Sequence, residues 1–408
     1  MSPLNPLRTS ASLTPSLVSD TPSGGTSPSK VASSRSRFKA WMERAKVMIA
    51  IDPTEEVINL FDSFFQLEEV PSGLIYDPLP TPTWDEEADF QAAIRAWASR
   101  LRPVDLDNYG ILSELHTLAL AYSRIRKTSN NRSKEHSQRR GIDDILEMAL
   151  SARADCHTDF RTEESYRLAG LDGNPDAVSD TLVTISSAKI ADEISSCSFT
   201  FTNRSVADHL YWSTIGVTDI FSIIGFAGEF KKEDAECNKN QLIMVLTTAQ
   251  SQRKALGFKK SIIMGATSCR GCVQIYSSYW SPDNAVIHIY EHAQQFNLTD
   301  PVQVIRLYVF CSKLGKYIQE LFATDLQDWT SPAETTLQNH RWRSPDRKRR
   351  LSESEGSTGT DVRTRRRSNG PSDADAAGTD QFSEVMKWRN EVIKDMQGQV
   401  FGYGQIAI

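Results

Sequence analysis

Apolar residues in the first third of the chain recur at the three- and four-residue spacing of amphipathic helices. In one stretch, Phe90, Ile94 and Trp97 fall on a single helical face. The same spacing recurs in the segments 38–49, 55–67, 84–101 and 109–125. Apolar stripes of this kind usually pack into a core rather than line a ligand groove, so the pattern predicts a helical region over residues 36–126.

From residue 141 onward the pattern alternates between helical and strand-like spacing. Helical spacing covers 141–154, 239–257 and 302–321, whereas short β-type runs occupy 182–185, 221–228, 261–265, 273–276 and 285–290. Gly257 is a usual stop for the second of these helices. The alternation predicts an α/β domain over 141–325, with a mixed sheet flanked by helices.

Two charged residues, Glu229 and Lys231, follow the apolar run 221–228. Residues two apart on a strand point to the same face, so these side chains project together and Phe230 points to the opposite face. A carboxylate in this position can hold a hard cation, while the lysine positions a water or an anionic oxygen beside it. Gln241 lies in the first turn of the next helix, where it can face the pair.

A strand ending in Glu-x-Lys, a helix with an early Gln and then further strands resembles the PD-(D/E)XK nuclease-like superfamily. More narrowly, Glu-Phe-Lys-Lys at 229–232, Asn-Gln at 240–241 and Leu-Gly at 256–257 are similar to an uncharacterised branch found in mushroom-forming fungi. Some members of that branch carry the module beside a kinase-like domain. The resemblance covers residues 140–325 and implies a restriction-endonuclease-like sheet.

The resemblance also implies a catalytic site. Its members would be Asp176, from the pair Pro175-Asp176, together with Glu229, Lys231 and Gln241. Asp176 and Glu229 would hold Mg²⁺, and Glu147 would be an accessory carboxylate.

The spacing leaves the first carboxylate open. Asp176 lies 53 positions before Glu229, so an insertion such as 187–212 would have to separate the two strands. Asp219, near the start of the run that ends in Glu229, and Asp180, just before the run 182–185, are the alternative first carboxylates.

Three functions are compatible with these residues. The first is Mg²⁺-dependent hydrolysis of phosphodiester bonds in nucleic acid. The second is a catalytically inactive nuclease-like fold that binds nucleic acid or protein. The third is a helical adaptor protein, in which Glu229 and Lys231 form a surface ion pair.

The ends of the chain differ in composition from its middle. Hydrophobic residues make up 39% of the chain, and the polar ends account for this low share. Residues 1–35 and 326–379 are rich in polar residues and predict disorder, and 380–397 suggests a short helix. No apolar run reaches the roughly 20 residues of a membrane helix, and no signal peptide is evident, so an intracellular protein without a membrane partner is expected.

The six cysteines are too scattered for a disulfide framework. Cys269-Arg-Gly-Cys272 lacks the second ligand pair of a zinc site, and strand-like runs flank it on both sides. A tight turn between two strands, with Gly271 in the turn, is the favoured interpretation.

Positive charge is concentrated near the C-terminus, although the whole chain carries a net charge of −6. Residues 341–370 contain ten Lys or Arg against four Asp or Glu, so this segment is +6 and the remainder is −12. Its clusters comprise Arg347, Lys348, Arg349, Arg350, Arg363, Arg365, Arg366 and Arg367. Two basic clusters twelve residues apart are typical of a nuclear localisation signal, so a nuclear import receptor is an expected partner and a cytoplasmic location is the alternative.

The predicted layout of the chain combines these patterns. It comprises a disordered segment 1–35, a helical region 36–126, a charged linker 127–140, a PD-(D/E)XK-like domain 141–325, a disordered basic tail 326–379 and a short helix 380–397.

Replacing the eight basic residues of the two clusters by alanine should move the protein from the nucleus to the cytoplasm. Because the clusters lie in a segment predicted to be unfolded, the melting temperature should not change. Fluorescence microscopy of the tagged protein and a thermal melt check both points. Unchanged nuclear accumulation would remove the targeting hypothesis.

Overall fold

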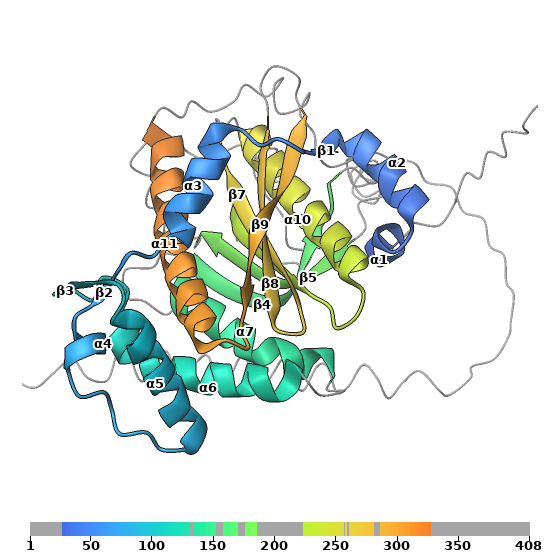
Figure 1. Cartoon of the computed structure of the whole chain (residues 1–408). Helices are drawn as coiled ribbons and strands as arrows, with labels where there is room; N and C mark the ends of the chain where they lie inside the picture. Colours follow the sequence, from blue (N-terminus) through green and yellow to red (C-terminus); the bar gives the residue numbers. More distant parts are fainter. Residues whose placement is uncertain are drawn as a thin grey trace, which may run out of the picture. The chain divides into compact units, whose positions relative to one another are not determined.

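The computed structural model describes residues 27–129, 134–151, 158–169, 176–185, 223–256, 258, 261–280 and 286–327. The chain divides into two units, Met1–Asp346 and Arg347–Ile408, and all described residues belong to the first. That unit is built on a seven-stranded mixed sheet with helices against both faces (Figure 1). The predicted α/β class is therefore confirmed.

The sheet has the strand order β1-β9-β8-β7-β6-β5-β4. The strands are β1 Val47–Ile49, β4 Thr158–Arg167, β5 Asp176–Ile185, β6 Ile223–Phe230, β7 Ile263–Cys269, β8 Cys272–Trp280 and β9 Ile287–Asn297. β6 pairs parallel with β7, and β1 pairs parallel with β9, whereas the other neighbours are antiparallel. A parallel pair needs a crossover, which helix α10, Ala235–Leu256, provides between β6 and β7.

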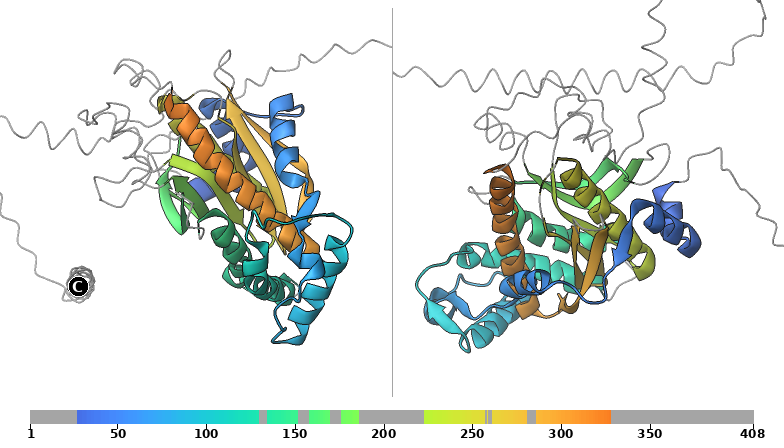
Figure 2. Two further views of the ribbon diagram at one scale, coloured as in Figure 1. Left: turned by 90° about the vertical axis from the view of Figure 1, so that its left-hand side faces the viewer. Right: turned by 90° about the horizontal axis from the view of Figure 1, so that it is seen from above.

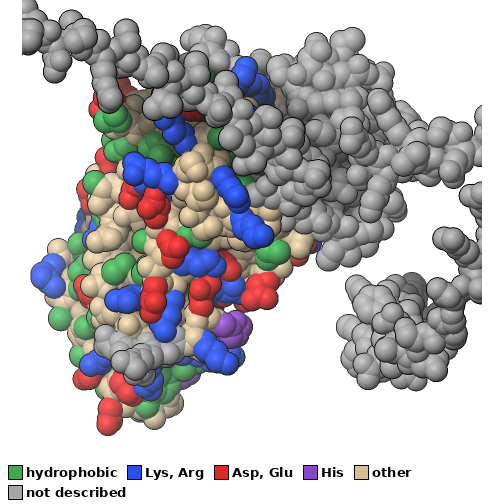
Figure 3. Space-filling model, turned by 90° about the vertical axis from the view of Figure 1, so that its right-hand side faces the viewer, with side chains coloured by type: hydrophobic (Ala, Val, Ile, Leu, Met, Phe, Trp, Pro, Cys, Tyr) green, Lys and Arg blue, Asp and Glu red, His purple; other side chains and the backbone are tan. Residues whose placement is uncertain are grey.

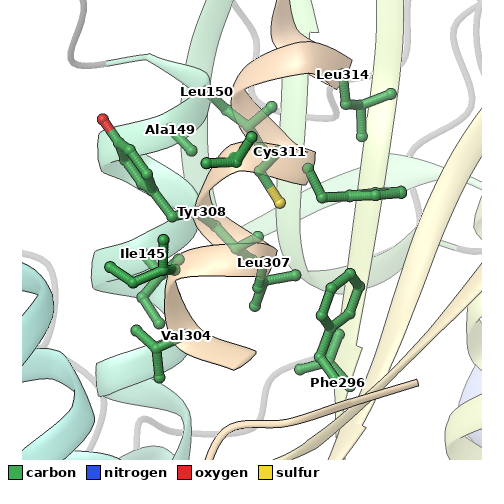
Figure 4. Close-up of a cluster of buried hydrophobic side chains, with 14 of the residues drawn as sticks. Ile145, Ala149, Leu150, Phe296, Val304, Leu307, Tyr308, Cys311 and Leu314 are labelled. Carbon is green, nitrogen blue, oxygen red and sulfur yellow. The ribbon is translucent and has the colours of Figure 1, made fainter. Parts of the chain in front are cut away.

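Two hydrophobic clusters hold helices against the two faces of the sheet. One cluster joins α7, Glu135–Leu150, and α11, Pro301–Gln327, to the sheet; Figure 4 shows Leu150 of α7 and Leu307 of α11 among its side chains. The other cluster joins α10 to α1, Pro28–Ala32, and α2, Arg35–Ala45. Figure 2 shows α11 and α10 on opposite sides of the strands, so the central strands are covered on both faces.

The helices of the first third share the core of the sheet. They are α3 Glu55–Phe65, α4 Gly73–Tyr76, α5 Asp85–Ala98 and α6 Ile111–Ser129, with a small parallel pair of β2 Glu69–Pro71 and β3 Arg102–Val104. Phe61, Phe90 and Leu118 belong to the same buried cluster as α7 and α11. The region 36–126 therefore contains helices, as predicted, but they complete the core of the α/β unit.

Two local predictions differ from the structure. Met48 and Ile49 lie on the edge strand β1, parallel to β9, because the helix α2 ends at Ala45 and Lys46 adopts a left-handed conformation. The segment 127–140 is mostly helical: its first residues continue α6, and Glu135 begins α7. Its charged side chains lie on helix surfaces or form ion pairs. Such a polar composition is also typical of a linker, which is why the sequence predicted one.

The segment Cys269–Cys272 forms the predicted tight turn. Cys269 ends β7 and pairs directly with Cys272 at the start of β8, and both are free thiols. Arg270 and Gly271 occupy the turn with φ of 51° and 80°. Positive φ at both central residues is the geometry of a two-residue hairpin, which Gly adopts at no steric cost.

Several predicted features lie outside the described residues. These are the segments 1–26, 187–212 and 380–397, Asp219, and the two basic clusters. Within the described part of the chain, no helix combines the length and apolar character that crossing a bilayer requires.

Ile224→Asp should abolish the stable fold. Ile224 is fully buried in β6, between α10 and the neighbouring strands, so the substitution places an unpaired carboxylate in the core. Such a change costs several kcal/mol, on the order of the whole stability of a small domain. Val178→Asp on β5 is the matched control, because Val178 is 52% exposed. Soluble yield and thermal melts compare the two; a folded Ile224→Asp protein would contradict the buried position of β6.

The free energy of unfolding should fall as the pH decreases from about 6.5 to about 4, owing to His292. This ring stacks on Phe61 at 3.8 Å, its Nε2 lies 2.8 Å from Ser277 Oγ, and burial lowers its pKa to about 4. The unfolded chain binds the proton at higher pH than the folded chain, so the stability is complete above pH 6.5 and is lost below it, by about 3 kcal/mol. His292→Gln should flatten this part of the pH profile, and substitution of the exposed His136 should leave it unchanged.

Candidate functional site

Glu229 lies at the carboxyl end of a strand that is buried along its whole length. All eight residues of β6 are buried, and Glu229 itself is 1% exposed. On one side Glu229 pairs with Thr267 of β7. On the other side Gly228 pairs with Thr181 of β5, so the next residue of β5 along this register, Asp180, lies beside Glu229.

Asp180 is held by groups from two elements. Its Oδ2 accepts a hydrogen bond of 2.8 Å from the backbone N–H of Phe230. Its Oδ1 lies 3.2 Å from Nη1 of Arg139, which comes from α7. The pairing of β4 with β5 skips Asp180 and Glu163, and Glu163 has a φ of 54°, so the ladder is interrupted at this carboxylate.

The surroundings of Glu229 disfavour the charged form of its carboxyl group. Burial raises its pKa well above the usual range, and the charge of Asp180 raises it further. The charge of Lys231 acts in the opposite direction but is outweighed. Oε1 of Glu229 is buried and has no hydrogen-bond partner among the described residues. A buried polar atom without a partner is costly, so a further donor or ligand at this oxygen would be stabilising.

Lys231 directly follows β6 and lies beside the same aspartate. Its Nζ donates a hydrogen bond of 2.9 Å to Oε1 of Glu135 on α7 and lies 3.9 Å from Oδ2 of Asp180. Partial burial acts to lower the pKa of Lys231, but the hydrogen bond to Glu135 and the charge of Asp180 outweigh it, so the pKa is raised. The ammonium therefore stays charged beside Asp180.

Helix α7 contributes an ion pair that the site shares. Nε of Arg139 donates a hydrogen bond of 2.6 Å to Oδ2 of Asp143, one helical turn later. Asp143 also accepts a hydrogen bond from the hydroxyl of Thr181, at 3.1 Å. Burial raises the pKa of Asp143 to about 6, against the opposing charge of Arg139. Together these bonds tie α7 to β5 next to Asp180.

The first predicted carboxylate, Asp176, begins β5 and pairs with Arg167 of β4. It lies four residues before Asp180, about 13 Å along an extended strand. Asp180, one of the two alternatives, is thus the aspartate that the sheet places beside Glu229. The other, Asp219, lies outside the described residues.

Gln241 lies on α10, but in its second turn and not in the first turn as predicted, because the helix begins earlier, at Ala235. Its Oε1 is 3.9 Å from the thiol of Cys237. Burial raises the pKa of the Cys237 thiol, and the nearby charges that act on it include those of Asp234, Lys231 and Glu229. Gln241 therefore borders the site without a recorded contact to Asp180 or Glu229.

Helix α7 contributes three residues that the sequence pattern did not predict, Glu135, Arg139 and Asp143. The segment that holds the first two was assigned to a linker. The available signal was the four-residue spacing of Arg139 and Asp143, which is typical of an ion pair on a helix. Glu147, the predicted accessory carboxylate, is exposed three turns along α7 from Glu135, which takes that place at Lys231.

The space at the site is small. A cavity of about 10 Å³ is lined by residues that include Glu135, Arg139 and Lys231. This volume is about that of a single water position. Neither Asp180 nor Glu229 lines this cavity, which lies next to them between the start of α7 and the residues that end and follow β6.

A larger cavity lies across β7 from Glu229. Its volume is about 640 Å³, and its wall includes Thr267, the register partner of Glu229, and Gln274, the register partner of Thr267. Arg35 and Lys39 of α2 also line it. A polar row thus leads from the candidate carboxylates across the sheet into a space large enough for a small ligand.

No protein-family model matches the chain, and no curated protein matches it. Within the described residues, no group of three or more His, Cys, Asp or Glu side chains is arranged to hold a metal ion. The pair of Asp180 and Glu229 supplies two carboxylates, and Mg²⁺ sites in proteins commonly use one or two carboxylates with water and phosphate as the remaining ligands.

Proposed function

We propose that the chain is a PD-(D/E)XK nuclease-like protein that hydrolyses phosphodiester bonds of nucleic acid with a divalent cation. The observation that carries the proposal is the meeting of Glu229 and Lys231, at the end of β6, with Asp180 in the middle of the neighbouring strand β5. These are two oxygen donors and one ammonium, gathered at the end of a buried strand.

The order of elements around the site supports a restriction-endonuclease-like fold. The strand β6 ends in Glu-x-Lys, α10 follows with Gln241 near its start, and β7 to β9 complete the sheet. This is the arrangement on which the resemblance to the superfamily was based.

The residues at the site fit a hard cation. Oε1 of Glu229 lacks a partner, and the adjacent Asp180 adds further oxygen ligands, which Mg²⁺ prefers. When bound there, Mg²⁺ would lower the pKa of a water ligand and neutralise charge on the scissile phosphate.

The protein's own groups have separate roles in this proposal. Asp180 and Glu229 hold the cation, and Lys231 stabilises negative charge on the phosphoryl oxygens. Glu135 orients the ammonium of Lys231 through their hydrogen bond. Gln241 orients the substrate or water from α10.

A second candidate is a nuclease-like fold that binds nucleic acid or protein without cutting. Two observations favour it: Arg139 already forms an ion pair with Asp180, and the cavity at the site measures about 10 Å³. The third function, a helical adaptor, receives no such support, because the helices of residues 36–126 pack onto the sheet that contains β6 to β9.

The described part of one face carries no broad cationic coat. Figure 3 shows basic and acidic side chains interspersed on the described part of one face, in keeping with the net charge of −6. Affinity for nucleic acid would therefore come from local contacts near the site and from the basic clusters of residues 347–367, which we also propose as the ligand of a nuclear import receptor.

Substitutions at the site separate cation binding from hydrolysis. Glu229→Gln and Asp180→Asn should each weaken Mg²⁺ binding, because each removes one of two ligand charges, whereas Asp176→Asn should not. Lys231→Ala should reduce cleavage by about 10²- to 10³-fold with Mg²⁺ binding retained, since its role is at the phosphate. Calorimetry measures binding, and an assay on single- and double-stranded DNA and RNA measures cleavage.

Matched controls are available on exposed surfaces. Glu147→Gln on α7 tests the loss of an exposed carboxylate, and Lys316→Ala, whose side chain is 79% exposed, tests the loss of an ammonium. A parent protein that is folded, binds neither Mg²⁺ nor Mn²⁺ and cuts none of the substrates would leave the non-catalytic function standing.

A further inference from the structure

Arg139 places a guanidinium against the carboxylate that the proposed function assigns to the cation. Its Nη1 lies 3.2 Å from Asp180 Oδ1, its Nε donates to Asp143 at 2.6 Å, and its Nη2 lies 3.5 Å from Glu163. The side chain is 7% exposed, so these charges meet in a poorly solvated environment. An arginine enclosed in this way donates to Asp180 in place of solvent, and its positive charge balances the carboxylate.

The guanidinium satisfies Asp180 but not Glu229. Both oxygens of Asp180 have partners, Oδ1 in Arg139 and Oδ2 in the N–H of Phe230. Oε1 of Glu229 has none among the described residues, although it is buried beside Asp180. The guanidinium of Arg139 thus pairs with Asp180 only and leaves Oε1 of Glu229 without a partner. A divalent ion between Asp180 and Glu229 would bind oxygens of both carboxylates.

The charges around the site leave room for such an ion. Glu135, Asp143, Glu163, Asp180 and Glu229 surround Arg139 and Lys231, so carboxyl groups outnumber cationic groups by five to two. A divalent ion and the guanidinium at the same aspartate would repel each other in this buried position. Only one of them can occupy Asp180 at low cost.

We propose that Arg139 is a built-in competitor of the divalent cation: it holds Asp180 in the cation-free protein and releases it when Mg²⁺ or Mn²⁺ binds. Asp143 retains the guanidinium through Nε after release, so Arg139 moves without becoming an unpaired buried charge. Because Arg139 and Glu135 both come from α7, release also loosens the contact of this helix with the end of β6 and enlarges the closed cavity. This inference rests on the proposed function, since it concerns the same Asp180–Glu229 pair.

Replacing Arg139 tests the competition directly on the full-length chain. In Arg139→Gln, the affinity for Mn²⁺ should rise by about tenfold or more. In the parent, Asp180 is free to bind the cation in only a fraction of the molecules, and the apparent affinity is lowered in proportion to that fraction. The melting temperature without metal should fall, and Mn²⁺ should restore it by more than it raises that of the parent. Calorimetry, Mn²⁺ paramagnetic resonance and thermal melts in chelator and in Mn²⁺ give these values.

Arg124→Gln is the matched control. Arg124 of α6 forms an ion pair with Asp144 of α7, the helix that carries Arg139, but has no ion pair with Asp180, and its side chain is 35% exposed. This variant should bind Mn²⁺ as the parent does. Mn²⁺ should raise the melting temperature of this variant by no more than it raises that of the parent.

A structural tether would give a different result. If Arg139→Gln binds Mn²⁺ no more tightly than the parent, or loses stability that Mn²⁺ does not restore, the competition is overturned. If that variant does not fold, Arg139→Lys keeps a positive charge for Asp143 but lacks the fork that reaches Asp180 as well. Unchanged Mn²⁺ affinity in folded Arg139→Lys overturns the inference in the same way.

The measurements distinguish failure of the Arg139 competition from failure of the proposed hydrolysis. Tighter Mn²⁺ binding by Arg139→Gln without cleavage of any nucleic acid supports the competition and contradicts hydrolysis. Cleavage by the parent, with no gain in Mn²⁺ affinity in either Arg139 variant, supports hydrolysis and overturns the competition. Absence of Mn²⁺ binding by both proteins overturns the competition as well.

Discussion

The burial of β6 on both faces is the constraint on which the structure depends. Every residue of this strand is buried, with α10 packed on one side and α11 and α7 on the other. The strand nevertheless ends in Glu229, whose carboxyl group is almost without solvent. A buried carboxyl group must be protonated, paired with a charge or bound to a cation. Burial and the charge of Asp180 raise the pKa of Glu229, so the groups that the surrounding strands and helices place beside it decide its protonation state.

Helix α7 connects the hydrophobic core to the charged site. Its apolar face, including Ile145 and Leu150, packs against α11, and Figure 4 shows Val304 and Leu307 of α11 in this contact. That packing fixes the rotation of α7, so its first two turns present Glu135 and Arg139 to Lys231 and Asp180. A shift of α7 would change the core and the electrostatics of the site together. This coupling explains how a helix can control access to Asp180 without being part of the sheet.

Local patterns predicted most of the elements, because helices and strands in this chain bury one face or both. The spacing of Phe90, Ile94 and Trp97 predicted α5, and the runs 261–265 and 273–276 fall within or next to β7 and β8. β4 was missed because an edge strand with polar residues has little apolar pattern. The prediction of a linker at 127–140 was wrong, because the charged side chains of this segment lie on helix surfaces and in ion pairs. Most partners in these ion pairs are distant in sequence, so the local pattern could not show them.

The sequence by itself determined that a carboxylate and an ammonium lie two residues apart where an apolar strand ends, since the apolar run stops before Glu229. It also determined the Cys269–Cys272 turn, since only a few residue types adopt positive φ readily. The tertiary structure alone decided which aspartate joins them. Register between β5 and β6 places Asp180, and not Asp176, beside Glu229, and that register is set by the packing of whole strands. It also brought Arg139 and Glu135 to the site from about ninety residues upstream, because the contact depends on how α7 packs on α11 and the sheet rather than on any local spacing.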